Sequence, residues 1–377
     1  MAAAAGDKQT TRAEQLGRIG PNWFASVMGT GIVATAGATL PVDLPGLGPL
    51  THAVWVIAAL MLAVLVVVVG GHWLSHPTVA RSHARNPQMA HFYGAAPMAL
   101  MTVGGGALLV GGDIIGQQAA VTLAWVLWTA GTIGGLFTAF SIPYLMFTQH
   151  SVEPDAAFGG WLMPVVPPMV SAATGALLIP HTPTGAARQT MLYGCYAMFG
   201  LSLIAAFIII TMIWSRLVLY GTSGTARVPT LWIVLGPLGQ SITAVGLLGH
   251  NAASAVDPEI AASLDIFAII FGVPVWGFAV LWIALATALT VRTLRRGMPF
   301  ALTWWSLTFP VGTFVTGTTQ LALHTDLPAF SIAAVIAYLG LLSSWLLVAV
   351  RTANGSMRGN LLTVTPSTAP VRARKDS

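Results

Sequence analysis

Apolar residues run through the chain in ten long segments, which short polar stretches separate. A membrane helix needs roughly 20 residues to cross about 30 Å of hydrocarbon. The segments that meet this length are residues 21–40, 51–71, 91–111, 119–145, 158–180, 190–214, 228–249, 262–291, 299–322 and 328–350. The pattern therefore predicts an all-α membrane domain of ten transmembrane helices at residues 20–351. It also predicts polar tails at 1–19 and 352–377, the second of them basic and disordered.

The odd-numbered segments share a design that the even-numbered segments lack. They carry an internal proline and a later glycine, at Pro97 with Gly104, Pro167 and Pro168 with Gly175, Pro237 with Gly246, and Pro310 with Gly317. These pairs recur about every 70 residues, and the stretch from Ser26 to Gly31 takes the equivalent place in the first segment. The even segments are smoother and rich in Val, Leu and Ile, with Pro274 of the eighth segment as an exception. We therefore expect five helical hairpins, with proline-kinked odd helices facing a central pore and even helices facing lipid.

The distribution of positive charge predicts the orientation. All Lys and Arg residues except Arg188 lie in the two tails or in alternate loops. Cytoplasmic loops carry such an excess, so both termini are expected in the cytoplasm of a multi-pass cell-membrane protein. This placement also explains the pI of about 9.8 without nucleic acid as a partner.

Composition narrows the classes of function. Only 7% of the residues are charged and the mean hydropathy is +0.78, as expected for a protein whose surface contacts membrane lipid. The single cysteine, Cys195, excludes an internal disulfide and a cysteine-based metal cluster. The best candidate for an intramembrane proton relay is Asp265, near the start of the eighth segment, where an interfacial carboxylate is the simpler interpretation.

The polar residues of the odd segments are almost all neutral. They are Asn22, Ser26, Thr30, Thr102, Ser171, Thr174, Gln240, Ser241, Thr243, Thr308, Thr313, Thr316 and Gln320. Hydroxyl groups and backbone N–H groups freed near proline suit an anion, because cations are bound by carbonyl or carboxylate rings. The residues expected to line the pore are Ser26, Thr30, Pro97, Gly104, Pro168, Gly175, Pro237, Ser241, Pro310, Thr313 and Gly317.

Two interpretations from other classes remain open. His72 and His76 stand four residues apart, as in membrane oxidoreductases that bind a metal or haem, but the other histidines are scattered and favour interfacial positions. Alternatively, the basic C-terminal tail recruits a partner and the protein acts without transport. We expect no metal, no cofactor and no enzymatic activity.

Two motifs resemble a known family. The stretch from Gly20 to Ile32 opens the first segment and the stretch from Trp304 to Pro310 opens the ninth. Both are similar to the tellurite-resistance/dicarboxylate transporter family, over roughly residues 18–351. That family includes malate permeases, sulfite efflux pumps and the slow anion channels of plant guard cells. The resemblance implies ten helices in a quasi-fivefold arrangement around a neutral pore, a homotrimer, and a gate formed by a phenylalanine of the ninth helix.

The motif places that gate at Phe309, with Phe314 as the alternative. Five residues along a helix turn the side chain by about 140°, so one face cannot present both rings. The residues before the prolines of the third and seventh segments are small, Ala96 and Gly236, which leaves room for one large ring at Phe309. The expected function is transport of small anions, such as chloride, nitrate, sulfite or a C4-dicarboxylate like malate. The alternative is a proton-coupled dicarboxylate or sulfite efflux carrier.

Overall fold

The computed structural model describes residues 20–75, 77–78, 86–87, 89–222, 224–225 and 227–357, and all regular structure within them is helical. Ten main helices follow the ten predicted segments. They are α2 (Phe24–Ala38), α3 (Leu47–Ser75), α5 (Ala95–Gly106), α7 (Gln117–Thr148), α8 (Pro167–Leu178), α9 (Ala186–Tyr220), α10 (Leu235–Ala252), α11 (Pro258–Leu294), α12 (Phe309–Thr325) and α13 (Pro328–Met357). A π-helical turn, Ala107–Gly111, continues α5 into α6 (Gly112–Ile115). The prediction of an all-α membrane protein is confirmed.

Each main helix lies in or overlaps its predicted segment, but α8, α10 and α12 begin seven to ten residues after the predicted starts at 158, 228 and 299. The last helix runs to Met357, past the expected boundary at residue 351. The expected tails at 1–19 and beyond residue 357, and His76 of the histidine pair, lie outside the described residues.

Seven helical segments in the described part of the chain are long and apolar enough to cross a membrane. They are Leu47–Ser75, Ala90–Ile115, Gln117–Thr148, Ala186–Tyr220, Val228–Ala252, Pro258–Leu294 and Pro328–Met357. The other three helices, α2, α8 and α12, have 15, 12 and 17 residues, which is short for a span. Each is short because the first part of its apolar segment is not α-helical.

A 3₁₀ segment precedes each of the helices α2, α5, α8, α10 and α12. These segments are Pro21–Trp23, Ala90–Gly94, Gly159–Leu162, Val228–Val234 and Leu302–Leu307. The expectation of prolines that kink the middle of these helices is therefore wrong. Pro97, Pro168, Pro237 and Pro310 stand at the second or third residue of an α-helix that begins after the 3₁₀ segment. Proline is tolerated in a first turn because the N–H that it lacks has no intrahelical partner there.

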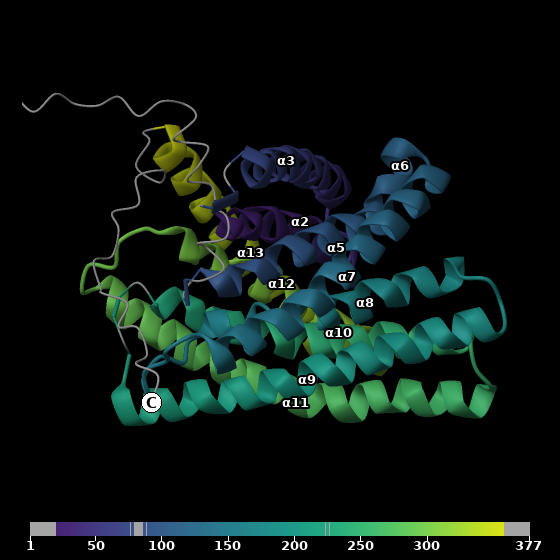
Figure 1. Ribbon diagram of the computed structural model, residues 1–377. Helices are drawn as coiled ribbons and strands as arrows, with labels where there is room; N and C mark the ends of the chain where they lie inside the picture. The colour runs from purple at the N-terminus through teal and green to yellow at the C-terminus, as the bar shows by residue number, and fades with distance from the viewer. Residues whose placement is uncertain are drawn as a thin grey trace, which may run out of the picture.

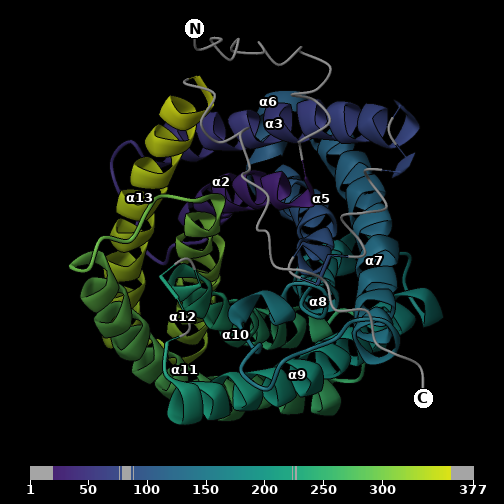
Figure 2. The ribbon, with the colours of Figure 1, turned by 60° about the vertical axis from the view of Figure 1, so that its left-hand side comes forward.

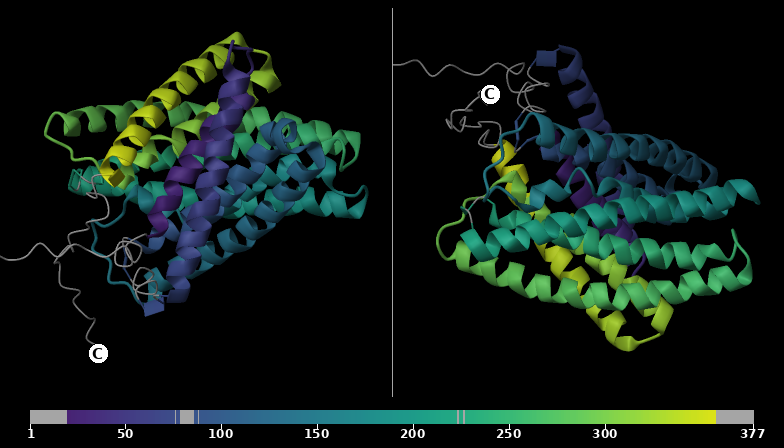
Figure 3. Two further views of the ribbon diagram at one scale, coloured as in Figure 1. Left: turned by 90° about the horizontal axis from the view of Figure 1, so that it is seen from above. Right: turned by 60° about the horizontal axis from the view of Figure 1, so that its bottom comes forward.

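The helices form two layers. The short helices α2, α5, α8, α10 and α12 lie inside, and α3, α7, α9, α11 and α13 surround them (Figures 1 and 2). Each inner helix packs against the outer helix that follows it in the chain. Around the inner layer, α2 contacts α5, α5 contacts α8, α8 contacts α10 and α10 contacts α12. The last hairpin returns to the first, since α12 and α13 both contact α2 (Figure 3).

Burial follows this division. In the most apolar window of α3, α7, α11 and α13, 22% of the residues are buried, against 89% in Val228–Ala252. The outward faces of the long helices carry exposed large side chains such as Val67, Phe140, Phe147 and Ile270. Such a surface is stable only against lipid or another apolar partner.

Tryptophans of the outer helices donate hydrogen bonds to the inner layer. Trp55 of α3 donates to the Val103 carbonyl at 3.0 Å, and Trp128 of α7 donates to the Ser171 carbonyl at 2.9 Å. Further bonds run from Trp276 to Thr318, from Trp282 to the Leu231 carbonyl and from Trp345 to Thr30. These bonds join α2, α5, α8, α12 and the 3₁₀ segment before α10 to the outer helices, and they limit the rotation of the inner elements.

Glycine permits the closest approach between inner helices. A Cβ atom at Gly239 of α10 would collide with the backbone of Thr313 and Phe314 in α12. At Gly236, three residues earlier on α10, a Cβ atom would meet open space. The close crossing of α10 and α12 therefore depends on Gly239 and not on Gly236.

This difference gives a test of the inner packing. Gly239→Ala should lower the thermal stability of the purified protein, because backbone cannot yield as a flexible side chain does, and overpacking costs roughly 1–3 kcal/mol. Gly236→Ala, on the same helix, should leave the melting temperature unchanged or slightly higher, since alanine favours helix. Equal melting temperatures for the two variants would contradict the crossing described above.

Candidate functional site

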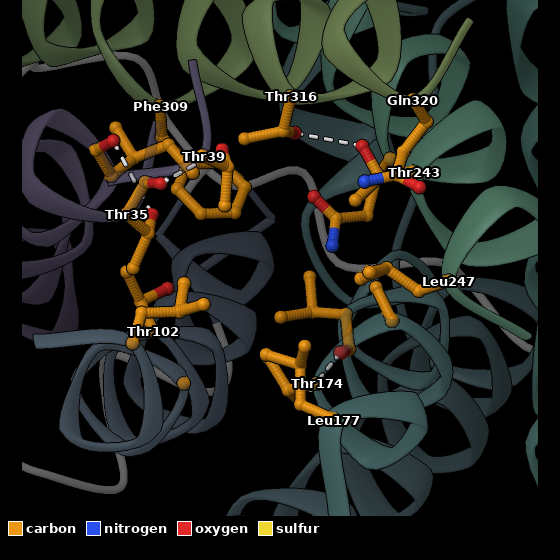
Figure 4. Close-up of a pocket in the computed structure, with 16 residues that line it drawn as sticks. Thr35, Thr39, Thr102, Thr174, Leu177, Thr243, Leu247, Phe309, Thr316 and Gln320 are labelled. Atoms are coloured by element: carbon orange, nitrogen blue, oxygen red, sulfur yellow. Dashed lines mark hydrogen bonds between the residues drawn. The ribbon is translucent and has the colours of Figure 1, made fainter. Parts of the chain in front are cut away.

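A cavity of about 100 Å³ lies among the five inner helices. Sixteen residues line it, and every inner helix contributes (Figure 4). They are Ile32, Thr35, Thr39, Thr102, Gly105, Leu109, Val170, Ala173, Thr174, Leu177, Gln240, Thr243, Leu247, Phe309, Thr316 and Gln320. None of these lining residues is charged.

The lining residues occupy one face of each helix. On α2 and at its C-cap they are Ile32, Thr35 and Thr39, spaced three and four residues apart. The same spacing recurs on α5 with its π turn, on α8 and on α10. Residues at these intervals share a face because an α-helix has 3.6 residues per turn. The cavity is therefore the meeting place of five equivalent helix faces.

Equivalent residues of successive hairpins form levels along this cavity. One level contains Thr35, Gly105, Ala173, Thr243 and Thr316, at intervals of 68 to 73 residues. The next level, nearer the C-terminal ends of the helices, contains Thr39, Leu109, Leu177, Leu247 and Gln320. The middle of the cavity is thus lined by small residues and threonines, and one end mostly by leucines.

The third level differs in the fifth hairpin. Ile32, Thr102, Val170 and Gln240 line the cavity from the first four inner helices. The equivalent residue of α12 is Thr313, whose hydroxyl group instead donates to carbonyl oxygens of Leu235 and Pro310, at 3.1 and 2.7 Å. Phe309, one turn earlier on α12, reaches the cavity in its place (Figure 4).

The two candidate gate residues have different surroundings. Phe309 is the first residue of α12 and lies at the cavity, with 3% of its surface exposed. Phe314 points to the outer layer, where its ring stacks on Trp276 of α11 with centroids 6.1 Å apart. The structure thus separates the two rings, as the helical geometry required.

The threonine hydroxyl groups of the cavity already donate hydrogen bonds. Those of Thr35, Thr39, Thr102 and Thr174 donate to the carbonyl oxygens of Ile32, Thr35, Met98 and Val170 in their own helices. Thr243 and Thr316 lie 2.7 Å apart, oxygen to oxygen, and also reach the carbonyls of Gly239 and Thr313. Both protons of this pair are therefore engaged, and the threonines offer the cavity mainly methyl groups and lone pairs.

The carboxamides of Gln240 and Gln320 are different. Each residue is about 95% buried, with 5% and 6% of its surface exposed. Within the described part of the chain, neither side chain has a hydrogen-bond partner, although both line the cavity. Each amide therefore presents two N–H donors and one carbonyl to whatever occupies the cavity.

An ionisable pair, which the cavity lining does not include, joins α12 to α11. His324 of α12 stands one turn after Gln320, and its Nδ1 is 2.7 Å from the backbone carbonyl oxygen of Gln320. Its Nε2 is 3.1 Å from a carboxylate oxygen of Asp265 on α11. Asp265 is half exposed, so the carboxylate proposed from sequence lies at the margin of the inner layer.

Apart from Phe309, the residues expected from sequence to line a pathway are absent from this cavity lining. These residues are Ser26, Thr30, Pro97, Gly104, Pro168, Gly175, Pro237, Ser241, Pro310, Thr313 and Gly317. The four prolines begin helices, as described above. The others contact neighbouring helices or their own backbone: Thr30 accepts a bond from Trp345, and a Cβ atom at Gly317 would lie 2.7 Å from the Gly239 carbonyl oxygen.

A different signal would have found the lining. Thr102, Thr174, Gln240, Thr243, Thr316 and Gln320 all belong to the neutral polar residues noted in the sequence. A search for polar residues at spacings of three, four and seven that recur in successive hairpins would have separated these six from the other polar residues. It would also have added Thr35 and Thr39. The prolines and glycines expected from sequence mark helix starts and helix contacts, whereas Gly105, which was not among them, lines the cavity.

Comparison with known proteins identifies the family. Residues 18–353 match the family described as voltage-dependent anion channels. A sulfite efflux pump of Trichophyton rubrum is 25% identical over 335 residues, which cover 87% of this chain and 88% of the pump. An uncharacterised transporter of Methanocaldococcus jannaschii is 28% identical over 328 residues, with the same coverage of both chains. A malic acid transport protein of Schizosaccharomyces pombe is 20% identical over 342 residues, covering 87% of this chain and 76% of that protein.

The match spans nearly the whole described helical domain and bears out the resemblance of the two sequence motifs. It also excludes the oxidoreductase interpretation, because the matched proteins are channels and transporters. The chain therefore belongs to the voltage-dependent anion channel family of membrane anion channels and transporters.

Proposed function

We propose that the protein lets small monovalent anions cross the membrane through the cavity of the inner helices. The five hairpins are then a quasi-fivefold pore domain, and the cavity is the middle of its pathway. The observation that carries this proposal is the uncharged cavity, which the same face of all five inner helices lines. A wall of neutral residues without carboxylates disfavours cations, which need carbonyl or carboxylate rings.

Because no positively charged side chain lines the cavity, a permeating ion with a single negative charge is favoured. Each charge that leaves water must be compensated by donors or by an opposite charge. Two amides and no Lys or Arg line the cavity, so a monovalent anion such as chloride, nitrate or hydrogen sulfite meets the smaller penalty. The similarity to sulfite efflux pumps supports a small inorganic anion as the permeating ion.

A C4-dicarboxylate such as malate is the second candidate. It is favoured by the 20% identity to a malic acid transport protein. Its two charges would have to share the same amides, and it needs more room than an inorganic ion. We therefore place it behind the monovalent anions.

The remaining features of the proposal come from sequence and resemblance. Phe309 closes the pathway at the N-terminal end of α12, and both termini are cytoplasmic in a cell-membrane protein. The exposed apolar faces of the outer helices contact lipid and the neighbouring subunits of a homotrimer.

The gate can be tested by removing the ring. Phe309→Ala should raise the anion conductance of the protein in planar bilayers or liposomes severalfold, because a hydrophobic plug is replaced by space for water. Phe314→Ala serves as the matched control, since its ring contacts Trp276 and not the cavity. Equal conductance in Phe309→Ala and wild-type protein, both normally assembled, would remove Phe309 as the gate.

The pathway can be mapped with single cysteines, because the one native cysteine, Cys195, is fully buried in α9. Thr316→Cys, in the cavity wall, should react with a small water-soluble methanethiosulfonate. Thr313→Cys, one turn earlier and turned toward α10, should not react. Labelling of Thr313→Cys alone would show that the pathway runs elsewhere. Labelling is read by mass spectrometry against the unsubstituted protein.

A pH gradient separates channel from carrier. The cavity lining holds no titratable group, so nitrate flux into liposomes should be the same with and without a proton gradient at equal membrane potential. Gradient-driven accumulation that Asp265→Asn abolishes would instead establish the proton-coupled carrier, with the Asp265–His324 pair as its relay.

A further inference from the structure

We propose that the carboxamides of Gln240 and Gln320 form the anion-binding site of the cavity, where their N–H groups coordinate the permeating ion. This inference rests on the proposed function and names the groups that perform it. It places the site on one wall of the cavity, on the adjacent helices α10 and α12.

Few hydrogen-bond donors of the cavity wall are free to bind an anion. An anion in a neutral cavity is held by N–H and O–H groups that are free to donate. The threonine hydroxyl protons are committed to backbone carbonyls or to each other. The glutamine amides are the cavity-lining side chains that keep their donors unused in the described part of the chain.

The amides are also open to an occupant of the cavity. Gln240 and Gln320 are each about 95% buried and unpaired with protein, but their amide atoms are not among the fully buried unpaired atoms of the described residues. The part of each side chain that stays accessible therefore faces the cavity. Most polar groups inside proteins are paired, and an ion or its accompanying water supplies the partner here.

The fold also makes room for the side chain of Gln320. A Cβ atom at Gly246 of α10 would lie 2.6 Å from the Cβ and 2.8 Å from the Oε1 of Gln320. Gly246 therefore lets Gln320 lie flat against α10. Three of the four equivalent positions in the other hairpins are leucines, so the amide is particular to α12.

The two amides act at different depths. Gln240 belongs to the level next to Phe309, and Gln320 to the level of the leucines. The Thr243–Thr316 pair lies between these levels on the same two helices. An ion that leaves one amide therefore passes the threonine pair before it meets the other, which gives the pathway two linked binding positions.

The test uses nitrate as the probe and methionine as a replacement of similar length without donors. In Gln240→Met and in Gln320→Met, the nitrate concentration for half-maximal flux into liposomes should rise about tenfold, as expected for loss of hydrogen bonds to a charge. Gln320→Glu should nearly abolish flux, because it places a carboxylate in the site. The matched control is Thr319→Val, which removes a buried hydroxyl group next to Gln320 that is unpaired in the described structure and lies outside the cavity lining.

A second measurement does not depend on transport. Nitrate should raise the melting temperature of the detergent-solubilised wild-type protein, since a ligand that binds only the folded state stabilises it. This shift should disappear in both methionine variants and persist in Thr319→Val.

The outcomes separate the two proposals. In one outcome, the wild type conducts nitrate, and both methionine variants keep its half-saturation concentration and its stabilisation by nitrate. This outcome overturns the amide site and leaves the proposed function standing. Absence of flux in the wild type and in Phe309→Ala, together with nitrate stabilisation that both methionine variants lose, overturns the proposed function and supports the site. Absence of both flux and stabilisation in the wild type overturns both.

Discussion

The structure depends on keeping interrupted helices away from lipid. In a hydrocarbon layer, every backbone N–H and C=O group must find a partner within the protein, so a span that is not a continuous α-helix cannot face the lipid. A 3₁₀ segment precedes each inner helix, and α5, α8, α10 and α12 carry a proline in their first turn. The outer helices are continuous over 29 to 37 residues and supply the cover that these breaks require. The two-layer arrangement follows from this division.

The cover also fixes the position of what it covers. Indole N–H groups of Trp55, Trp128 and Trp345 bond to inner helices, and Gly239 lets α10 and α12 meet backbone to backbone. The side chains that line the cavity are those on the helix face that makes neither the tryptophan bonds nor the helix crossing. Packing therefore decides which side chains line the cavity, and their chemistry makes the lining uncharged.

Sequence reasoning recovered the ten helices because apolar length and the alternation of basic loops are strong signals for a membrane chain. It also recognised the alternation of two kinds of helix. It misplaced the role of proline, since Pro97, Pro237 and Pro310 look internal when a whole apolar segment is counted as helix. Only the backbone shows that the α-helix begins beside them.

The cavity was predicted less well, and for a physical reason. Ser241 and Thr243 are both neutral hydroxyl residues of α10, two positions apart, so composition treats them alike. They point about 160° apart around the helix, and only Thr243 reaches the cavity. Helix rotation is set by contacts such as the tryptophan bonds, which no local pattern reveals. Phe309 was singled out by a motif of the ninth segment and does line the cavity, while its role as a gate stays a prediction.

The levels of the cavity have a consequence for how such a protein can diversify. Five copies share one backbone design, but each presents its own residue at a given level, such as Thr, Leu, Leu, Leu and Gln at the level of residue 320. One substitution therefore alters about a fifth of the cavity wall at that level while the four other positions keep their residues. Five unequal repeats within one chain give this scaffold what a symmetric homopentamer lacks, the freedom to change one position of a level at a time.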